Sequence, residues 1–533
     1  MLRYIPIDKK QAICIIVALI LTSVFACTCF GLAREMHGSL GYVSDEKWYV
    51  CATRNILREV FNVQPSYVDS EGRHHYTVFF RGWNDRASSL KVSGSVTLYE
   101  DVGYEGEWIT FTEDIRSLVP VCKAKENFVN FVERELGGKI IAHDGGNLYK
   151  KTAGVSIATP KKLDYENLFE TFPQIKIIQS GYVYHPDTDD RLRTYLNTEH
   201  PPLAKYFIGL SMLFLGDEPL NWKIPSIVAG SLTILFVYLI VARLLKNEIV
   251  ALIVFPIAFT DPILKAMSSV AMLDIYVAFF SALSAWLALR RNYLLSGIFI
   301  GFAASCKLSG AFLTLALFSF MAIFQRAGVK KSAFHALVVP LSVWLAFNSP
   351  FMIYQGPQPW IEGVMGSLSW HTSPRPPGAP VSTPWGWFVN ENPFALHLSP
   401  DLFASVNPTT YIAALIALIF VPYLAIKDRD YLVPGLWFGF TFFLFLLVYA
   451  LGNRTQYSYY AITLSPMVYV MSSVLAYYIA LNTWTCFKLL RVLLAGGKLK
   501  WALIQIARNP RSAPRELRKI HASSESQRDN PAS

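Results

Sequence analysis

Charged residues are scarce in this sequence. Only 16% of its 533 residues are Asp, Glu, Lys or Arg, whereas 53% are hydrophobic and 14% are aromatic. This composition lies far from that of ordinary soluble proteins and excludes a typical soluble domain. The shortage of charge is therefore the first indication of a membrane protein with several spans.

Cysteine is also rare, with seven residues, and no Cys/His spacing typical of a zinc site occurs. Cys14, Cys27, Cys29 and Cys306 fall in or beside apolar segments, where cysteines pack as small hydrophobic side chains. That leaves one pair, Cys51 with Cys122, that could form a disulfide outside the membrane. The sequence indicates no resident metal and no certain cofactor, although it leaves a divalent metal open.

Long apolar runs account for most of the chain. One of them, "AICIIVALILTSVFACTCFGLA", follows "MLRYIPIDKK", lacks a small-residue cleavage site and exceeds the apolar core of a signal peptide. We therefore expect a retained anchor whose basic flank faces the cytoplasm.

Basic residues in short loops orient the spans, because such loops stay in the cytoplasm. The loops "RLLKNE", "RR", "QRAGVKK" and "KDRD" share one side if ten segments cross. Those segments are 12–33, 225–245, 248–262, 268–289, 293–306, 308–325, 332–353, 409–426, 431–451 and 456–483. A crossing at 203–217 would invert every later loop, so a re-entrant or juxtamembrane helix is predicted there, and eleven spans is the alternative.

Two long loops face outward on this topology, 34–200 and 354–408. Alternating patterns such as "HHYTVFFRGW" and a helix-like "KENFVNFVERELGG" predict a small extracytoplasmic α+β insertion. The second loop is rich in Pro, Trp and Gly and is predicted to be an interfacial structural loop, with direct sugar contact as the alternative. The resulting units are 1–64 (first span and acidic loop), 65–165 (insertion), 166–483 (multi-span core with the outer loop 354–408) and 484–533 (basic cytoplasmic tail).

Ionisable residues beside spans are costly and suggest function. Those predicted at the outer face are Asp45, Glu46, Glu199, His200, Lys205, Lys223, Asp261, Asp274, Lys307 and Arg454. Acids and bases at a bilayer surface suit a lipid-borne anionic substrate, and a polyprenyl-phosphate sugar fits this description. Its phosphate is a good leaving group, so transfer needs one base and positive charge near that phosphate.

Several motifs occur in an order that resembles a known family. They are "GYVSDEKWYVCATRNIL", "EHPPLAKYF", "NWKIPSIVAGSLTILFVYLIVARLL", "SSVAMLDIYVAFFSALSAWLAL", "GIFIGFAASCKLSGAFL" and "GNRTQYSYYAITLSP". The family is that of the dolichyl-phosphate-mannose protein O-mannosyltransferases, glycosyltransferase family 39. The resemblance implies an all-α polytopic membrane protein of about 10–11 spans with the C-type glycosyltransferase fold. It does not extend to residues 65–165.

Position and resemblance together predict the site. Asp45 is expected to be the general base, with Glu46 orienting hydroxyl groups, and the alternative is that "SDEKWY" only caps a helix. Donor phosphate and lipid are expected at His200, Lys205, Lys223 and Arg454, with Glu199, Asp274 and Lys307 as supporting polar groups. Family members usually carry arginine in place of Lys223, so a bidentate fork is replaced here by a point charge.

These observations predict an inverting glycosyltransferase of the plasma membrane with its active site on the extracytoplasmic face. It would move mannose or a similar hexose from a polyprenyl-phosphate carrier to a Ser or Thr hydroxyl of an exported protein. A lipid or glycan acceptor is the alternative, as is a lipid-linked sugar transporter or flippase, although no internal repeat is visible. Expected partners are membrane lipid, the lipid-linked donor and the acceptor, with a dimer open and nucleic acid excluded, because the basic tail suits anionic headgroups.

Overall fold

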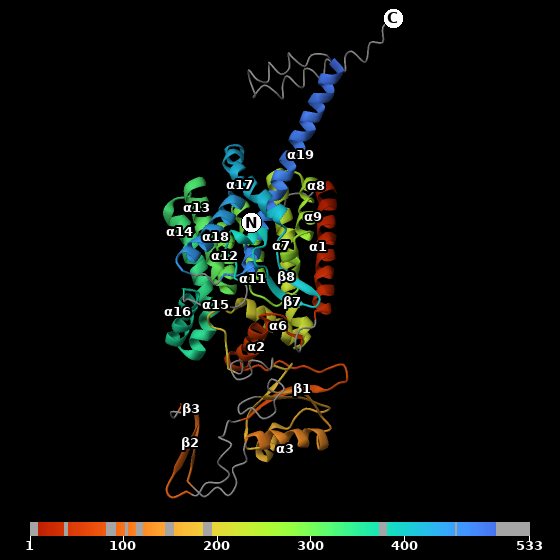
Figure 1. Cartoon of the computed structure of the whole chain (residues 1–533). Coiled ribbons are helices and arrows are strands. Elements are labelled where there is room, and N and C mark those ends of the chain that lie inside the picture. Colours follow the sequence, from red (N-terminus) through yellow and green to blue (C-terminus); the bar gives the residue numbers. More distant parts are fainter. Residues whose placement is uncertain are drawn as a thin grey trace.

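The structure is a computed structural model. It describes residues 9–36, 41–80, 92–101, 105–112, 121–143, 154–184, 194–372, 381–452 and 456–496. A bundle of helices makes up most of the molecule, and a smaller unit of strands and helices lies at one end of it (Figure 1). The predicted fold class, a helical membrane protein with a small α+β insertion, is confirmed.

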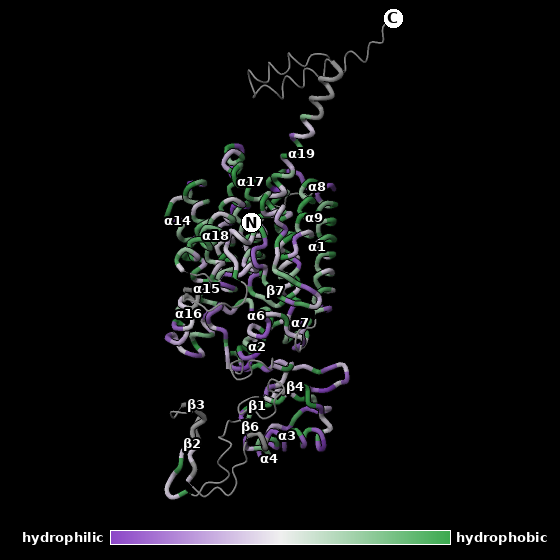
Figure 2. The backbone as a smooth tube through the Cα atoms, in the orientation of Figure 1, coloured by the Kyte–Doolittle hydropathy of each residue, from purple (hydrophilic) through white to green (hydrophobic). Residues whose placement is uncertain are grey.

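Among the described residues, five helices are long and apolar enough to cross a membrane. They are α1 (Lys9–Glu35), α7 (Pro219–Leu245), Val329–Gln355 with α14 (Val329–Ala333) and α15 (Val339–Gln355), α17 (Pro408–Lys427), and Arg429–Ala450 with α18 (Leu432–Ala450). Hydrophobic residues run along helices such as α1 and α17 (Figure 2).

The remaining apolar helices are shorter or broken, except for α19 (Ser465–Gly496), which has 32 residues. They are α6 (Leu203–Leu215), α8 (Glu248–Ala251), α9 (Val254–Phe259), α10 (Pro262–Ser268), α11 (Asp274–Leu289), α12 (Tyr293–Cys306), α13 (Leu313–Ser319) and α19. The α8–α9 segment and α10 meet at 76° and make a sixth candidate span. Each of the ten predicted segments contains a helix, and the number that cross stays a prediction.

The structure departs from the predicted segments at two places. Residues 269–273 are not helical, so the segment predicted at 268–289 becomes helical only at Asp274, where α11 begins. The break is tolerated because the carboxylate of Glu46 accepts a hydrogen bond from the backbone N–H of Ala271 (2.7 Å). At the other end, α19 continues to Gly496, inside the predicted tail.

The predicted basic loops lie together on one face of the bundle. Their contacts are Arg243 and Arg291 with Asp430 (3.4 and 2.5 Å), Lys246 with Asp428 (3.5 Å), and Arg429 with the carbonyl of Phe324 (2.6 Å). The beginning of α1 reaches the same face, since Gln11 donates to Glu248 (3.0 Å). The basic loops therefore share one face of the bundle, as the charge rule predicts.

Both ends of α6 lie at the opposite face, next to the α+β unit. Lys205 near its beginning donates to the carbonyl of Asn197 (2.5 Å), and Asp217 after its end receives the backbone N–H of Tyr182 (2.9 Å). α6 has 13 residues and both of its ends at one face, and its juxtamembrane or re-entrant placement stays a prediction.

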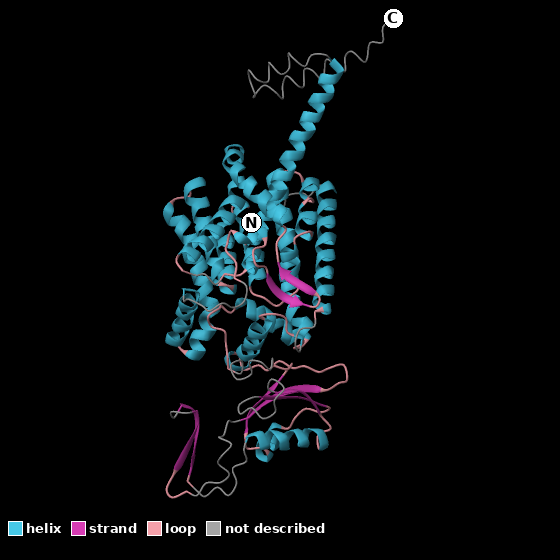
Figure 3. Ribbon diagram, viewed as in Figure 1, coloured by secondary structure: helices cyan, strands magenta, loops and turns pink. Residues whose placement is uncertain are grey.

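The α+β unit contains one four-stranded sheet in the order β4–β5–β1–β6. Its strands are β1 (His74–Phe80), β4 (Lys139–His143), β5 (Gly154–Thr159) and β6 (Ile175–Ser180), and its helices are α3 (Val121–Arg134) and α4 (Tyr165–Thr171). A separate hairpin pairs β2 (Val96–Asp101) with β3 (Glu105–Phe111) (Figure 3). The unit extends beyond the predicted boundary at 165, because β6 pairs antiparallel with the central strand β1.

The outer loop 354–408 is partly regular. It contains α16 (Pro357–Thr372), a short 3-10 turn (Gly386–Val389) and a hairpin of β7 (Phe394–Leu398) with β8 (Asp401–Ala404). In Figure 3 this hairpin lies against the helix bundle, away from the sheet of the α+β unit. The loop therefore packs on the bundle as the predicted structural loop would.

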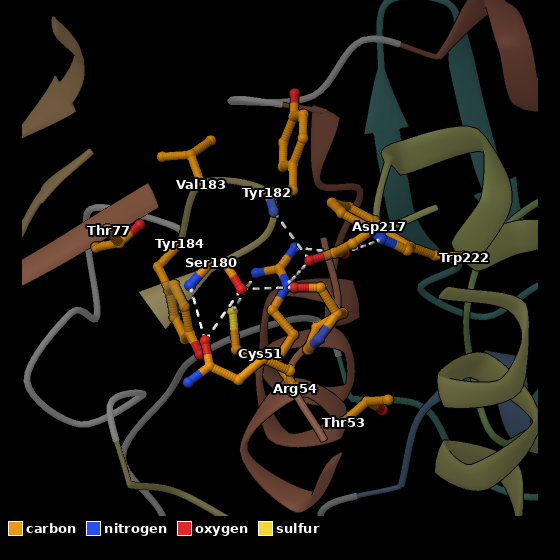
Figure 4. A network of polar contacts seen from close by, with 12 residues as sticks. Cys51, Thr53, Arg54, Thr77, Ser180, Tyr182, Val183, Tyr184, Asp217 and Trp222 are labelled. Atoms are coloured by element: carbon orange, nitrogen blue, oxygen red, sulfur yellow. Dashed lines mark hydrogen bonds and ion pairs between the residues drawn. The ribbon is translucent and has the colours of Figure 1, made fainter. Parts of the chain in front are cut away.

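A buried ion pair inside the helix bundle lies next to the α+β unit, and its Asp217 carboxylate also accepts the backbone N–H of Tyr182 (2.9 Å; Figure 4). Arg54, on α2 (Glu46–Asn55), forms two bonds to the carboxylate of Asp217, with Nε–Oδ2 at 2.6 Å and Nη2–Oδ1 at 3.1 Å. The carboxylate also accepts the indole N–H of Trp222 (2.7 Å), and Arg54 donates to the hydroxyl of Tyr42 (2.6 Å). The Cys51 thiol lies beside this hydroxyl (3.5 Å) and takes part in no disulfide, so the predicted pair with Cys122, whose side chain lies outside the described part of the chain, is not found.

Removing one charge of this pair tests its contribution. Because Asp217→Asn leaves the Arg54 charge buried without its counterion, we expect a loss of about 3–5 kcal/mol in the free energy of unfolding. Lys246→Gln removes the exposed pair with Asp428 and should cost less than about 1 kcal/mol. Denaturant unfolding of both variants in detergent measures the difference, and equal losses would contradict the proposed role of the buried pair.

Candidate active site

A cavity of about 520 Å³ lies where α2, the loop before α6, α16 and the segment before α19 meet. It is lined by Asp45, Trp48, Tyr49, Tyr195, Asn197, Glu199, His200, Lys307, Gly363, Gly366, Ser367, Phe394, Tyr457, Tyr459 and Tyr460. Four predicted site residues from three separate segments, Asp45, Glu199, His200 and Lys307, are thus brought together.

Asp45 stands at the N-cap position of α2, yet its side chain makes no capping hydrogen bond. Its backbone carbonyl instead accepts the N–H of Trp48 (3.0 Å). Ser44 before it has a φ of +54°, a left-handed conformation that costs energy for a residue with a β-carbon. This turn leaves the Asp45 carboxylate facing the cavity, so the alternative that Asp45 serves only as a helix cap is not supported.

Lys307 and Asp274 form an ion pair at the cavity wall. Asp274 is the first residue of α11 and Lys307 directly follows α12, so each charge lies at the helix end that favours it. The ammonium is 2.8 and 2.9 Å from the two carboxylate oxygens. It also lies 4.1 Å from the centre of the Tyr460 ring and 5.5 Å from that of Tyr459. The pair is neutral overall, and Lys307 is the member that lines the cavity.

Glu199 and His200 come from the loop that precedes α6. The carboxylate of Glu199 accepts hydrogen bonds from the amide of Asn197 (2.8 Å) and from the hydroxyl of Tyr195. Burial raises the pKa of Glu199 above its ordinary value, although the positive charge of Lys205 opposes the shift. The ring of His200 lies 5.9 Å from that of Tyr49, on α2.

Glu46 and Lys223 lie behind the cavity and do not line it. The Glu46 carboxylate accepts backbone N–H groups of Val43 (2.8 Å) and Ala271 (2.7 Å). The ammonium of Lys223 is fully buried, lies 3.8 Å from Glu46 and has no hydrogen-bond partner among the described residues. These positions favour a supporting role for both residues over direct contact with substrate.

Other predicted residues fall elsewhere. Lys205 is fully buried beneath the loop that carries Glu199, and Arg454 lies outside the described residues. Asp261 accepts the backbone N–H of Asn407 (2.9 Å) and the hydroxyl of Tyr469 (2.7 Å), which is a structural arrangement. Where the structure describes the chain, no group of three or more His, Cys, Asp or Glu side chains could hold a metal ion.

Aromatic side chains form much of the cavity wall, and the sequence analysis did not assign them to the site. Trp48 directly follows the acidic motif and contacts the ring of Tyr195 at 5.7 Å. Tyr457, Tyr459 and Tyr460 come from "TQYSYY", where the repeated tyrosines were a signal available in the sequence. A cavity with aromatic walls and few charges suits a sugar, which presents both apolar faces and hydroxyl groups.

The outer loop contributes a second wall that sequence patterns could not reveal. Gly363 packs so closely on the loop before α6 that an added β-carbon would lie 2.7 Å from the hydroxyl of Thr198. At Gly366 such a carbon would meet no atom within 4 Å, so this position leaves space at the cavity. The predicted interfacial loop therefore also borders the site.

The sequence of this chain is similar to those of known proteins. A family model described as "Dolichyl-phosphate-mannose-protein mannosyltransferase" matches residues 199–354, from the cavity loop through most of α15. A polyprenol-phosphate-mannose–protein mannosyltransferase from Corynebacterium glutamicum is 25% identical over 392 residues, covering 54% of this chain and 75% of that protein.

Two solved structures match part of the chain at low similarity. ArnT from Cupriavidus metallidurans bound to undecaprenyl phosphate is 15% identical with a TM-score of 0.40, over 58% of this chain and 55% of that chain. An Archaeoglobus fulgidus oligosaccharyltransferase tethered with an acceptor peptide is 14% identical with a TM-score of 0.35, over 57% of this chain and 43% of that chain. This chain thus spans about half the length of either structure. The family match and the curated relative confirm the predicted resemblance and the expected class of enzyme.

The electrostatics of Asp45 lead to a prediction about pH. Burial raises the pKa of Asp45, and the positive charges of Lys307 and Lys47 oppose that rise. Subtracting the infrared titration of Asp45→Asn from that of the parent should therefore isolate the signal of one carboxyl group, which titrates above the ordinary aspartate range. Lys307→Met removes an opposing cation and should move this titration to still higher pH.

The exposed lysine on the opposite face provides the control for this titration. Lys246→Gln should leave the Asp45 signal where it is in the parent, because Lys246 pairs with Asp428 among the basic loops. A downward shift in Lys307→Met, or no shift, would contradict the assigned influence of Lys307.

Proposed function

We propose that this chain, a membrane glycosyltransferase related to the dolichyl-phosphate-mannose protein mannosyltransferases, transfers mannose or a similar hexose with inversion. The donor is a polyprenyl-phosphate sugar, and the acceptor is a Ser or Thr hydroxyl of an exported protein. The proposal is carried by one observation: the Asp45 carboxylate makes no helix-capping hydrogen bond and lines an aromatic cavity that Lys307 also lines.

In the proposed reaction, Asp45 accepts the proton of the acceptor hydroxyl. The hydroxyl oxygen forms a bond to the anomeric carbon while the bond from that carbon to the phosphate oxygen breaks. The electron pair of the broken bond leaves with the polyprenyl phosphate, and the proton passes from Asp45 to solvent. Attack opposite the leaving phosphate inverts the anomeric carbon, and a carboxylate suffices as base because the sugar carbon becomes strongly electrophilic.

Positive charge at the leaving phosphate is the second requirement. Lys307 lines the cavity with its ammonium, and His200 lines it from the opposite segment, so these two residues are proposed to face the donor phosphate. Arg454 is proposed as a further phosphate ligand from its place in "GNRTQYSYY". Asp274 orients Lys307, and Glu199 is proposed to accept a sugar or acceptor hydroxyl.

Glu46 and Lys223 are proposed to act one layer further from the substrate. Glu46 holds the turn that presents Asp45, through its bond to the N–H of Val43. Lys223 supplies a compensating charge 3.8 Å from that carboxylate. Lys223 stands where relatives usually carry arginine, and this proposed role does not require the two parallel hydrogen bonds that an arginine can make to a phosphate.

The transfer assay tests the central role of Asp45. Asp45→Asn keeps the shape of the side chain but cannot act as a base, so transfer from radiolabelled polyprenyl-phosphate mannose should fall about 10²–10⁴-fold. Glu362→Gln, an exposed change on α16, is the matched control and should retain the parent rate. Label recovered in protein supports the proposed acceptor, whereas label in the lipid extract assigns a glycolipid acceptor instead. A folded Asp45→Asn enzyme with the parent rate would remove Asp45 from the mechanism.

Orientation is the other testable part of the proposal, which puts the cavity and the α+β unit outside the cytoplasm. The support is that the basic loops share the opposite face, as the positive-inside rule requires. In a background with Cys27, Cys122 and Cys486 replaced by serine, Lys139→Cys should react with an impermeant thiol reagent on intact cells. Lys246→Cys should react only after the membrane is opened, and the reverse pattern would invert the orientation.

A further inference from the structure

Lys205, in the "HPPLAK" stretch, is saturated with hydrogen bonds inside the protein. Its ammonium donates to the backbone carbonyl of Asn197 (2.5 Å), to the side-chain oxygen of the same residue (3.0 Å) and to the carbonyl of His200 (2.8 Å). An ammonium has three N–H donors, so none is left for another ligand. The side chain is also fully buried and is not among the described residues that line the cavity.

All three oxygens belong to the loop that carries part of the cavity wall. Asn197 sits at a φ of +54°, in the left-handed region, where a non-glycine residue needs support from its surroundings. Its amide nitrogen donates to Tyr195 (2.7 Å) and to Glu199 (2.8 Å), while its amide oxygen receives Lys205. A continuous chain of contacts therefore runs from Lys205 through Asn197 to the carboxylate of Glu199.

Two features of the site disfavour a positive charge on Lys205, and its contacts oppose both. Burial lowers the pKa of Lys205 to about 7, and the residue lies in the first turn of α6, where the helix dipole disfavours positive charge; the converging oxygens and the negative charge of Glu199 favour the ammonium form. Pro201 and Pro202 stiffen the chain between the loop and the helix, because proline fixes φ. A single nitrogen with three directional donors suits three converging oxygens, whereas the planar fork of arginine does not.

We infer that Lys205 is a positioning residue that anchors the loop 195–200 so that Glu199 and His200 face the cavity, and that it is not a ligand of the donor phosphate. The inference refines the proposed function and relies on it for the kinetic part of its test. It reassigns the lysine that the sequence analysis placed among the donor-binding residues.

A double-mutant cycle in the transfer assay distinguishes the two roles. Lys205→Met and Asn197→Ala break the same chain of contacts, so each should lower kcat about 10²-fold, with a smaller change in KM for polyprenyl-phosphate mannose. The double variant should be no worse than Lys205→Met alone, because contacts in one network are not additive. If the two losses in kcat multiply in the double variant, or if Lys205→Met alone greatly raises the KM for the donor, Lys205 would instead be assigned to the phosphate.

The conservative variant gives an independent comparison. Lys205→Arg keeps the charge, and an arginine serves a phosphate site well. In a closed anchor with three converging oxygens, the wider guanidinium does not fit, so Lys205→Arg should resemble Lys205→Met. Recovery of the parent kcat and KM by arginine would overturn the inference.

Hydrogen exchange separates this inference from the proposed function. Backbone amides in 195–200 should exchange at least about 10-fold faster in Lys205→Met, while those of 154–180 in the α+β unit stay at the parent rate. If the parent transfers no sugar, the proposed function fails, yet exchange still decides whether Lys205 holds the loop. Should Lys205→Met not accumulate, Asn197→Gly keeps the left-handed backbone without the amide and should show the same loosening. Unchanged exchange in 195–200 would refute the anchor.

Discussion

The carboxylate of Glu46 is the contact on which the arrangement of the site depends. One oxygen accepts the N–H of Val43, in the turn that presents Asp45, and the other accepts the N–H of Ala271, in the break before α11. A broken helix inside an apolar bundle is stable only when its free backbone groups find partners. Asp45 precedes Glu46 and α11 begins three residues after Ala271 with Asp274, so one buried side chain sets both halves of the site in register.

Most of the buried charges described above fall into two groups, and Lys223, which has no hydrogen-bond partner among the described residues and does not line the cavity, belongs to neither. Arg54, Asp217, Lys205 and Glu46 are enclosed, and protein groups satisfy most of their hydrogen-bonding capacity. Burying a charge without such partners would cost several kcal/mol, which is why these networks are dense. The second group, Asp45, Glu199, His200 and Lys307, lines the cavity, where these side chains can still contact a ligand. This separation lets the fold leave a few ionisable groups at the cavity without losing stability.

The two outer parts of the chain contribute differently. The α+β unit is fixed to the bundle by the contacts of Asp217 with Arg54 and Tyr182, beside the C-terminal end of α6, while the cavity lies at its beginning. The outer loop reaches the cavity itself through α16, where Gly363 allows close packing against Thr198. Insertions outside the bundle thus leave the reacting groups undisturbed, and the loop between α15 and α17 narrows the space around them.

Sequence patterns alone determined the membrane class, most of the helices, the common face of the basic loops and the α+β insertion, whereas the acidic motif was predicted from its position together with the family resemblance. The first four features follow from local composition and periodicity, or from charge in short loops, which the chain carries without reference to its fold. Which ionisable residues face the cavity could not be read in this way. Asp45 and Glu46 are adjacent in sequence, and His200 and Lys205 belong to one short motif. Asp45 and His200 nevertheless line the cavity, whereas Glu46 and Lys205 are enclosed. That choice depends on helix breaks, a left-handed turn and contacts between residues far apart in sequence, and only the tertiary structure decides them.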